Sequence, residues 1–278
     1  MLLDIRHETL YRYAVAANYS LQYLRLWPRA DGGQRVIKWR IDVPGRRWVQ
    51  TDAYGNAVHV SSLTESHGEI CVVAQGQVET PQERGLLLPH DCAVPPLVFA
   101  QPTPLTEADR AISALAAEAL GGQLAAELGD PEPLQTLAHA IFNRVAYVQG
   151  VTDVHNTAAE ALQQGQGVCQ DMAHIFLACC RARGIPARYV SGYLLTDATH
   201  AASHAWVEAW LPKAMGGAGA WLGFDVTHNR LAGPELCRLA VGRDYADTSP
   251  MRGIHVGGGG EALTVRVAVQ GCEPQADQ

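Results

Sequence analysis

The chain has 278 residues, of which 47% are hydrophobic and 18% charged, and its formal net charge at pH 7 is −7. This length favours two domains, and the apolar content is enough to bury a core, which excludes a fully disordered or fibrous protein. The sequence shows no concentrated basic patch, so we expect binding neither to nucleic acid nor to anionic membrane lipid.

The N-terminus and the cysteines indicate the cellular compartment. Residues 1–7 lack the basic stretch and long apolar run of a signal peptide, and no segment approaches the roughly 20 apolar residues that cross a bilayer. The seven cysteines are odd in number and scattered, unlike those of a small disulfide-bonded secreted domain. We therefore expect a cytoplasmic protein whose cysteines are mostly small buried hydrophobes.

The first 80 residues alternate between apolar and polar side chains, as in segments 36–43 and 68–74. This alternation predicts antiparallel strands. Five prolines then lie between Pro89 and Pro104, where they prevent regular strands and helices. We place the domain boundary there, with an N-terminal antiparallel β domain at 1–95 and a second domain at 96–278.

The second domain is predicted to contain helices first and a sheet afterwards. Thr106 begins a capping-type sequence before an Ala/Leu-rich helical run, and residues 132–148 have helical spacing. Thr157 caps a short helix, and residues 187–227 are strand-like. A final alternating strand at 263–269 is assigned to the same domain, so the predicted fold class is α+β.

Cys169 is predicted to lie in the first turn of a helix, because segment 164–186 contains a glycine turn, a helical stretch and a Gly-Ile-Pro stop. There the helix dipole and free backbone N–H groups favour a nucleophilic thiolate, and those N–H groups suit an oxyanion hole. An arbitrary free cysteine is more often buried. We take that interpretation for Cys179 and Cys180, and predict Cys169 as the nucleophile.

A hairpin formed by residues 203–211 and 221–227 places His204 and Asp225 nearly opposite each other on one face. Opposed Cβ atoms on one face are about 5 Å apart, and a carboxylate there fixes the imidazole tautomer for proton exchange with a thiol. Alone, a strand histidine is more often structural, and the aspartate can simply cap a turn. Together with Cys169 they predict a catalytic triad.

Three segments, 167–174, 203–208 and 223–229, resemble the three-box core of bacterial transglutaminase-like proteins. The order Cys, His, Asp is also that of papain-like thiol enzymes. Residues 1–80 resemble the N-terminal β region of the family, and residues 242–250 with the glycine-rich end resemble its C-terminal stretch. The resemblance therefore covers nearly the whole chain.

The resemblance implies a papain-like core in which helices pack on an antiparallel sheet. It also implies that Cys169 is the nucleophile, His204 the general base and acid, and Asp225 the residue that orients the histidine. Val226 is a departure, because many members have proline after the aspartate. Members include peptidases, amidases and acyl transferases, so no substrate is implied.

Four further residues are weaker predictions. Gln163 precedes the cysteine by six residues, where papain-like enzymes place an oxyanion glutamine, although an exposed position at a helix end is the simpler interpretation. Asp171 and His174 match the family box and are interpreted as supporting residues that fix the helix. Trp206 lies on the same strand face as His204 and suits either a substrate channel or the core.

These residues predict thiol-dependent acyl transfer on a peptide, protein or small amide, with hydrolysis as the outcome. Two alternatives stay open: transamidation of a protein glutamine or small molecule, and a noncatalytic scaffold that docks a partner protein. Closely paired cysteine ligands of the C-x₂-C kind are missing from the sequence, so we expect no metal and no cofactor. The oligomeric state and the acyl acceptor are not predicted.

Overall fold

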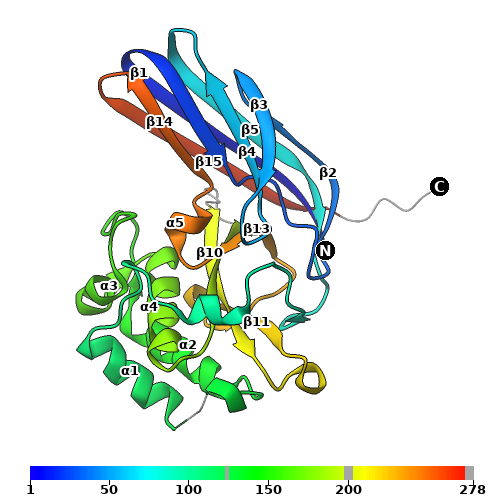
Figure 1. The fold of residues 1–278 in the computed structure, drawn as a ribbon, viewed down its shortest axis with the longest axis vertical. Coiled ribbons are helices and arrows are strands. Elements are labelled where there is room, and N and C mark those ends of the chain that lie inside the picture. The colour runs from blue at the N-terminus through cyan, green and yellow to red at the C-terminus, as the bar shows by residue number, and fades with distance from the viewer. Residues whose placement is uncertain (123–124, 197–202, 273–278) are drawn as a thin grey trace, which may run out of the picture.

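A long, curved antiparallel sheet forms the upper part of the molecule in the computed structural model, which describes residues 1–122, 125–196 and 203–272 (Figure 1). Its central strand, β1 (Leu2–Leu24), pairs along one side with β5 (His67–Glu79) and β4 (Ala57–Leu63). β2 (Arg35–Asp42) and β3 (Arg46–Thr51) form the outer row on that side. The predicted alternation is present, since alternate residues such as Leu3 and Ile5 are fully buried.

The other side of β1 pairs with β15 (Glu261–Cys272) and β14 (Met251–Gly257). The assignment of the C-terminal strand to the second domain was therefore wrong, because the chain returns to the N-terminal sheet. An alternating strand pattern specifies which face is buried but not which sheet edge the strand joins, and β1 offers an edge along its whole length. The boundary near residue 95 stays a prediction.

The second sheet has the strand order β12-β11-β10-β9-β13, with β6 added to β11. Its antiparallel strands are β6 (Leu87–Leu88), β9 (Ala187–Leu194), β10 (Ser203–Leu211), β11 (Ala220–Asp225), β12 (Arg230–Leu231) and β13 (Leu236–Gly242). A separate parallel pair joins β7 (Ala146–Tyr147) to β8 (Gln166–Gly167).

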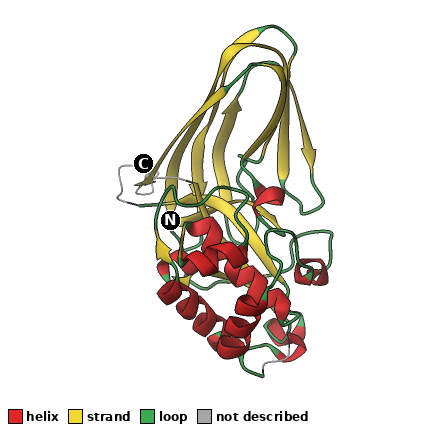
Figure 2. Cartoon of the chain, turned by 90° about the vertical axis from the view of Figure 1, so that its left-hand side faces the viewer, coloured by secondary structure: helices red, strands yellow, loops and turns green. Residues whose placement is uncertain are grey.

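Helices gather at the end of the molecule away from the long sheet (Figure 2). The α-helices are α1 (Arg110–Leu120), α2 (Glu132–Arg144), α3 (Ala158–Gln164), α4 (Cys169–Ala182) and α5 (Tyr245–Thr248). Short 3₁₀ turns are η1 (Pro96–Ala100), η2 (Ala125–Glu127), η3 (Met215–Gly217) and η4 (Val226–His228). None of the helices in the described ranges is long and apolar enough to cross a membrane.

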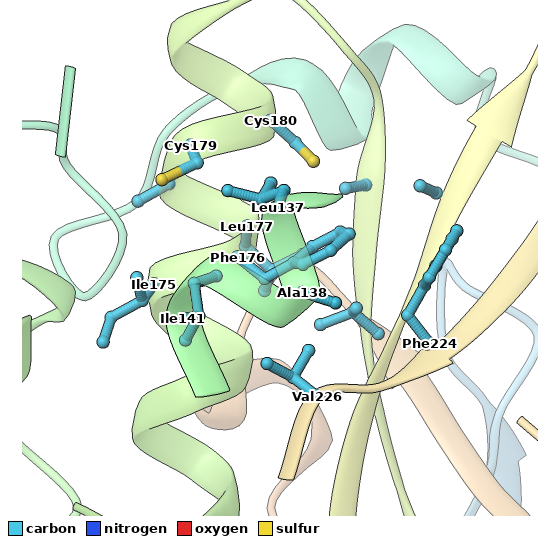
Figure 3. Packing of buried hydrophobic residues seen from close by; sticks show 14 of the residues in the cluster. Leu137, Ala138, Ile141, Ile175, Phe176, Leu177, Cys179, Cys180, Phe224 and Val226 are labelled. Atoms are coloured by element: carbon cyan, nitrogen blue, oxygen red, sulfur yellow. The ribbon is translucent and has the colours of Figure 1, made fainter. Parts of the chain in front are cut away.

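α4 is almost wholly buried and packs between the other helices and the second sheet. Its Phe176 lies against Phe224 of β11, with ring centroids 5.4 Å apart, and α2 adds Leu137 and Ile141 to the same core (Figure 3). Cys179 and Cys180 are fully buried on opposite sides of α4, and burial raises the pKa of Cys179 to about 12. Helices packed on an antiparallel sheet, with an antiparallel β domain before them, confirm the predicted α+β class.

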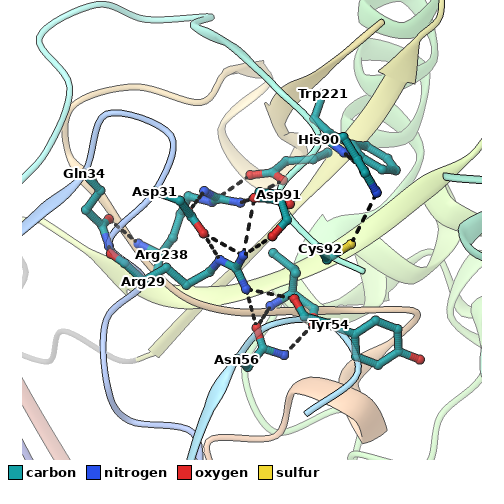
Figure 4. Close-up of polar contacts among 12 residues, drawn as sticks. Arg29, Asp31, Gln34, Tyr54, Asn56, His90, Asp91, Cys92, Trp221 and Arg238 are labelled. Carbon is teal, nitrogen blue, oxygen red and sulfur yellow. Dashed lines mark hydrogen bonds and ion pairs between the residues drawn. The ribbon is translucent and has the colours of Figure 1, made fainter. Parts of the chain in front are cut away.

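A cluster of buried charges joins the N-terminal segments to the second sheet (Figure 4). This arginine cluster consists of Arg29, Asp31, Asp91, Arg188, Glu208 and Arg238. Asp91 comes from the proline-rich segment, where sequence analysis placed the domain boundary. Glu208 lies on β10, four residues after His204, so the cluster anchors the strand that carries that histidine.

Candidate active site

Cys169 is the first residue of α4, and the backbone before it is held from two sides. β8 pairs in parallel with β7, and the Asp171 carboxylate accepts hydrogen bonds from the Val168 N–H and the Thr152 hydroxyl, both at 2.7 Å. Burial raises the pKa of Asp171. The predicted supporting residue therefore fixes the turn that presents Cys169, whose side chain remains partly accessible.

Gly167 allows this turn to be tight. A Cβ added at this position would lie 2.7 Å from both the Cβ and the Oδ2 of Asp171, closer than Cβ atoms approach other heavy atoms. Only glycine therefore lets the backbone pass so near the carboxylate that caps α4.

His204 and Asp225 are in contact, as the hairpin pattern predicted. β10 and β11 pair with Val207 opposite Phe224 and Glu208 opposite Gly223, which brings the His204 Nε2 to 2.9 Å from the Asp225 Oδ1. The Cys169 side chain interacts with the same imidazole. Burial lowers the pKa of His204, but the hydrogen bond to Asp225 and the interaction with Cys169 outweigh it and raise the pKa to about 10. The arrangement therefore favours a charged imidazolium next to the sulfur.

The second oxygen of Asp225 has partners that sequence analysis missed. His228 Nδ1 lies 2.8 Å from Oδ2, and Arg230 Nε lies 3.4 Å from it. Burial raises the pKa of Asp225, but the hydrogen bonds from His204 and His228 hold it well below its usual range. His228 lies in segment 223–229, the third segment that resembles the family. Its spacing of three residues from Asp225 was the one feature of the sequence that could have indicated a contact between them. Only the 3₁₀ turn η4 brings the two side chains together.

His204, Asp225 and His228 each have one atom that could bind a metal ion, and these three atoms lie within 4.8 Å of one another. Three such groups are also the kind that bind transition metals. Here each histidine contacts a different carboxylate oxygen at hydrogen-bonding distance, which accounts for their proximity without an ion. The expected absence of a metal stays a prediction.

Comparison with known proteins gives the family. Residues 114–226 match the transglutaminase-like superfamily, and residues 3–79 match the bacterial transglutaminase-like N-terminal region. The chain belongs to the transglutaminase-like superfamily. An uncharacterized protein of Mycobacterium leprae is 30% identical over 290 residues, covering 96% of this chain and 98% of that protein. One of Mycobacterium tuberculosis strain H37Rv is 32% identical over 280 residues, covering 90% and 86%.

A solved structure has a similar fold. It comes from Cytophaga hutchinsonii, is described as a candidate cysteine protease, and superposes with a TM-score of 0.77 at 21% sequence identity, covering all of this chain and 92% of that one. Family and fold together support the fold of a thiol-dependent enzyme.

The weaker predicted residues of this transglutaminase-like protein lie in different environments. Gln163 is exposed near the end of α3, and its oxyanion role stays a prediction. His174 is fully buried in α4, where its Nε2 accepts a hydrogen bond from the Tyr245 N–H and burial lowers its pKa to about 3. Trp206 is 1% exposed and stacks on His204 with ring centroids 6.2 Å apart, so it supports the imidazole from the core side.

Proposed function

We propose that this protein catalyses thiol-dependent acyl transfer on peptide or glutamine-like amides, with hydrolysis as the outcome. The observation that carries the proposal is that His204 hydrogen-bonds Asp225 at 2.9 Å and also interacts with Cys169. Its physical basis is the division of labour in a triad: a nucleophile, a proton carrier and a group that orients the carrier. The burial of Asp225 and the partial access of Cys169 support this division.

In the first half of the proposed reaction, the Cys169 thiolate attacks the carbonyl carbon of the amide and forms a carbon–sulfur bond. His204, charged through its contact with Asp225, gives its proton to the nitrogen of the leaving amine as the carbon–nitrogen bond breaks. Backbone N–H groups at the start of α4 are suited to stabilise the oxyanion that develops between these two events. The product of this half is a thioester on Cys169.

In the second half, an acceptor resolves the thioester. Water loses a proton to His204 while its oxygen attacks the carbonyl, and the sulfur leaves as thiolate beside the imidazolium. A primary amine would follow the same path and give a new amide. Water is the proposed acceptor because the described residues include no assigned amine site.

The test is incubation of purified protein with a peptide library, with and without an added primary amine, followed by mass spectrometry. We expect cleaved or deamidated peptides in both conditions, and no product from Cys169→Ala. Amine adducts in place of hydrolysis would favour transamidation. A folded Cys169→Ala variant that keeps the products would contradict the mechanism. A wild-type protein without products and with an unreactive Cys169 would favour the scaffold alternative.

A further inference from the structure

We propose that His228 is a positioning residue for this site, holding the Asp225 carboxylate so that one oxygen faces His204. The inference rests on the function proposed above and adds a fourth residue to the Cys169–His204–Asp225 unit. It comes from the different hydrogen-bond partners of the two carboxylate oxygens of Asp225.

The two oxygens of Asp225 have different partners. Oδ1 accepts from His204 at 2.9 Å, while Oδ2 accepts from the Nδ1 of His228 at 2.8 Å. Asp225 itself is completely buried, whereas the side chain of His228 is 40% exposed. The two imidazole rings lie 5.4 Å apart on the same carboxylate. His228 therefore reaches from the surface to the back of the triad without contacting the sulfur in any described interaction.

A buried carboxylate with one oxygen unpaired would carry a large desolvation cost and would be free to turn about its side-chain bond. Arg230 does not fill this need alone, because its Nε is 3.4 Å from Oδ2 while its Nη2 lies 2.8 Å from Glu235. A charge-assisted hydrogen bond from His228 satisfies Oδ2 at a normal length and keeps the carboxylate in one orientation. Fixing Oδ2 also fixes Oδ1, and with it the ring of His204.

The backbone around His228 is built for this contact. η4 ends at His228, the next residue, Asn229, adopts a left-handed conformation with φ of 48°, and β12 then pairs Arg230 with Asp225. This reversal returns the chain to Asp225 immediately after leaving it. The three residues after the aspartate thus bring a donor to the oxygen that His204 does not use.

Several charged or titratable groups surround Asp225 and must be counted in any pH experiment. They are His204 from β10, His228 from η4, Arg230 from β12 with its partner Glu235, and Cys169 from α4 beyond His204. Arginine side chains in general are protonated at any pH used in such an experiment. The pH profile of Cys169 reactivity therefore reports mainly the thiol, the two histidines and the carboxylate between them.

The experiment measures the alkylation rate of Cys169 by iodoacetamide from pH 4 to 9, with the modified peptide quantified by mass spectrometry. It compares wild type with Asp225→Asn, His228→Ala and His228→Gln, and uses His255→Ala as a control. His255 is a histidine of β14 whose carboxylate partner is Glu261, at 3.6 Å. Circular dichroism checks that each variant is folded.

We expect the midpoint of the wild-type profile to lie below that of an ordinary thiol. His228→Ala should move it upward by about one pH unit, the size expected for the loss of one charge-assisted hydrogen bond. Asp225→Asn should move it at least as far. His228→Gln, which keeps an amide donor, should recover part of the shift, and His255→Ala should leave the profile unchanged.

Two different failures can be told apart. If Asp225→Asn moves the profile and both folded His228 variants keep that of wild type, the positioning role is wrong while the triad stands. If wild-type Cys169 behaves as an ordinary thiol, the proposed function fails and the inference with it. Should His228→Ala not fold, the His228→Gln variant decides the question by itself.

Discussion

Replacing Asp91 with asparagine should strongly destabilise the protein, because Asp91 is the carboxylate that all three cluster arginines share. It lies 3.1 Å from the Nη2 atoms of both Arg188 and Arg238 and 3.4 Å from that of Arg29, with only 9% of its side chain exposed. Asp91→Asn leaves three arginines facing two carboxylates in a buried site. Removing one partner of a buried ion pair costs about 3–5 kcal/mol, a large part of the roughly 5–15 kcal/mol that stabilises a typical domain.

Urea unfolding followed by tryptophan fluorescence and circular dichroism measures this loss. A matched control is Glu79→Gln, which breaks the exposed pair between Arg35 and Glu79, with side chains 72% and 42% exposed. Such pairs contribute about 0–1 kcal/mol. Equal losses for Asp91→Asn and Glu79→Gln would refute the reasoning that burial decides the effect.

The pH dependence gives a second check on Asp91. Burial raises its pKa, but Arg188, Arg238 and Arg29 together hold it well below the usual range. A lowered folded-state pKa gives stability that is complete above the unfolded carboxyl pKa of about 4 and is lost as the pH falls below it. The difference between wild type and Asp91→Asn should therefore be largest near pH 7 and shrink in acid. A constant difference down to pH 3 would contradict the assignment.

Three further predictions concern the active site. Cys169→Ala and His204→Ala should abolish turnover while Asp225→Asn keeps a measurable residue of it, as steady-state rates of folded variants will show. Gly167→Ala should slow alkylation of Cys169 and lower the urea midpoint, because the new Cβ meets Asp171 at 2.7 Å; an unchanged variant would mean that the turn adapts freely. Burial lowers the pKa of His174 from 6.5 to about 3. This group should therefore lower the free energy of unfolding of the wild type by about 1.4 kcal/mol for each pH unit below pH 6.5. Unfolding titrations of His174→Gln should show a flatter dependence on pH.

Local sequence signals predicted most elements and some of their ends. Thr157 caps α3 through a complete capping box, as its sequence indicated. Thr106 does not cap α1, because the helix begins at Arg110 with Asp109 as its N-cap. Thr106 is instead fully buried and hydrogen-bonds Thr103 and Arg181. The local sequence around Thr106 fits both a capping residue and a buried hydrogen-bonding residue. The two roles can be distinguished only from the packing of α4, which is distant in sequence.

The site shows the same division between local and distant information. The position of Cys169 followed from a turn and a helix start, and the contact of His204 with Asp225 followed from one hairpin, so both were predictable. His228 was not singled out because a 3₁₀ turn leaves no period in so short a segment. The arginine cluster could not be predicted from the sequence. Successive members such as Arg29, Asp91 and Arg238 are more than 60 residues apart and belong to no common sequence pattern.

The relative placement of nucleophile and histidine depends on a contact that belongs to neither motif. Cys169 is positioned by α4 and the turn before it, whereas His204 and Asp225 are positioned by β10 and β11. Each half is internally fixed by hydrogen bonds, yet among the residues that the structure describes no backbone pairing joins α4 to the sheet. Packing of apolar α4 side chains against the sheet, with Phe176 against Phe224, sets the distance between the halves. Because close-packed cores transmit small shifts, the geometry of this thiol–imidazole pair depends on the core beneath it as much as on the three residues of the triad.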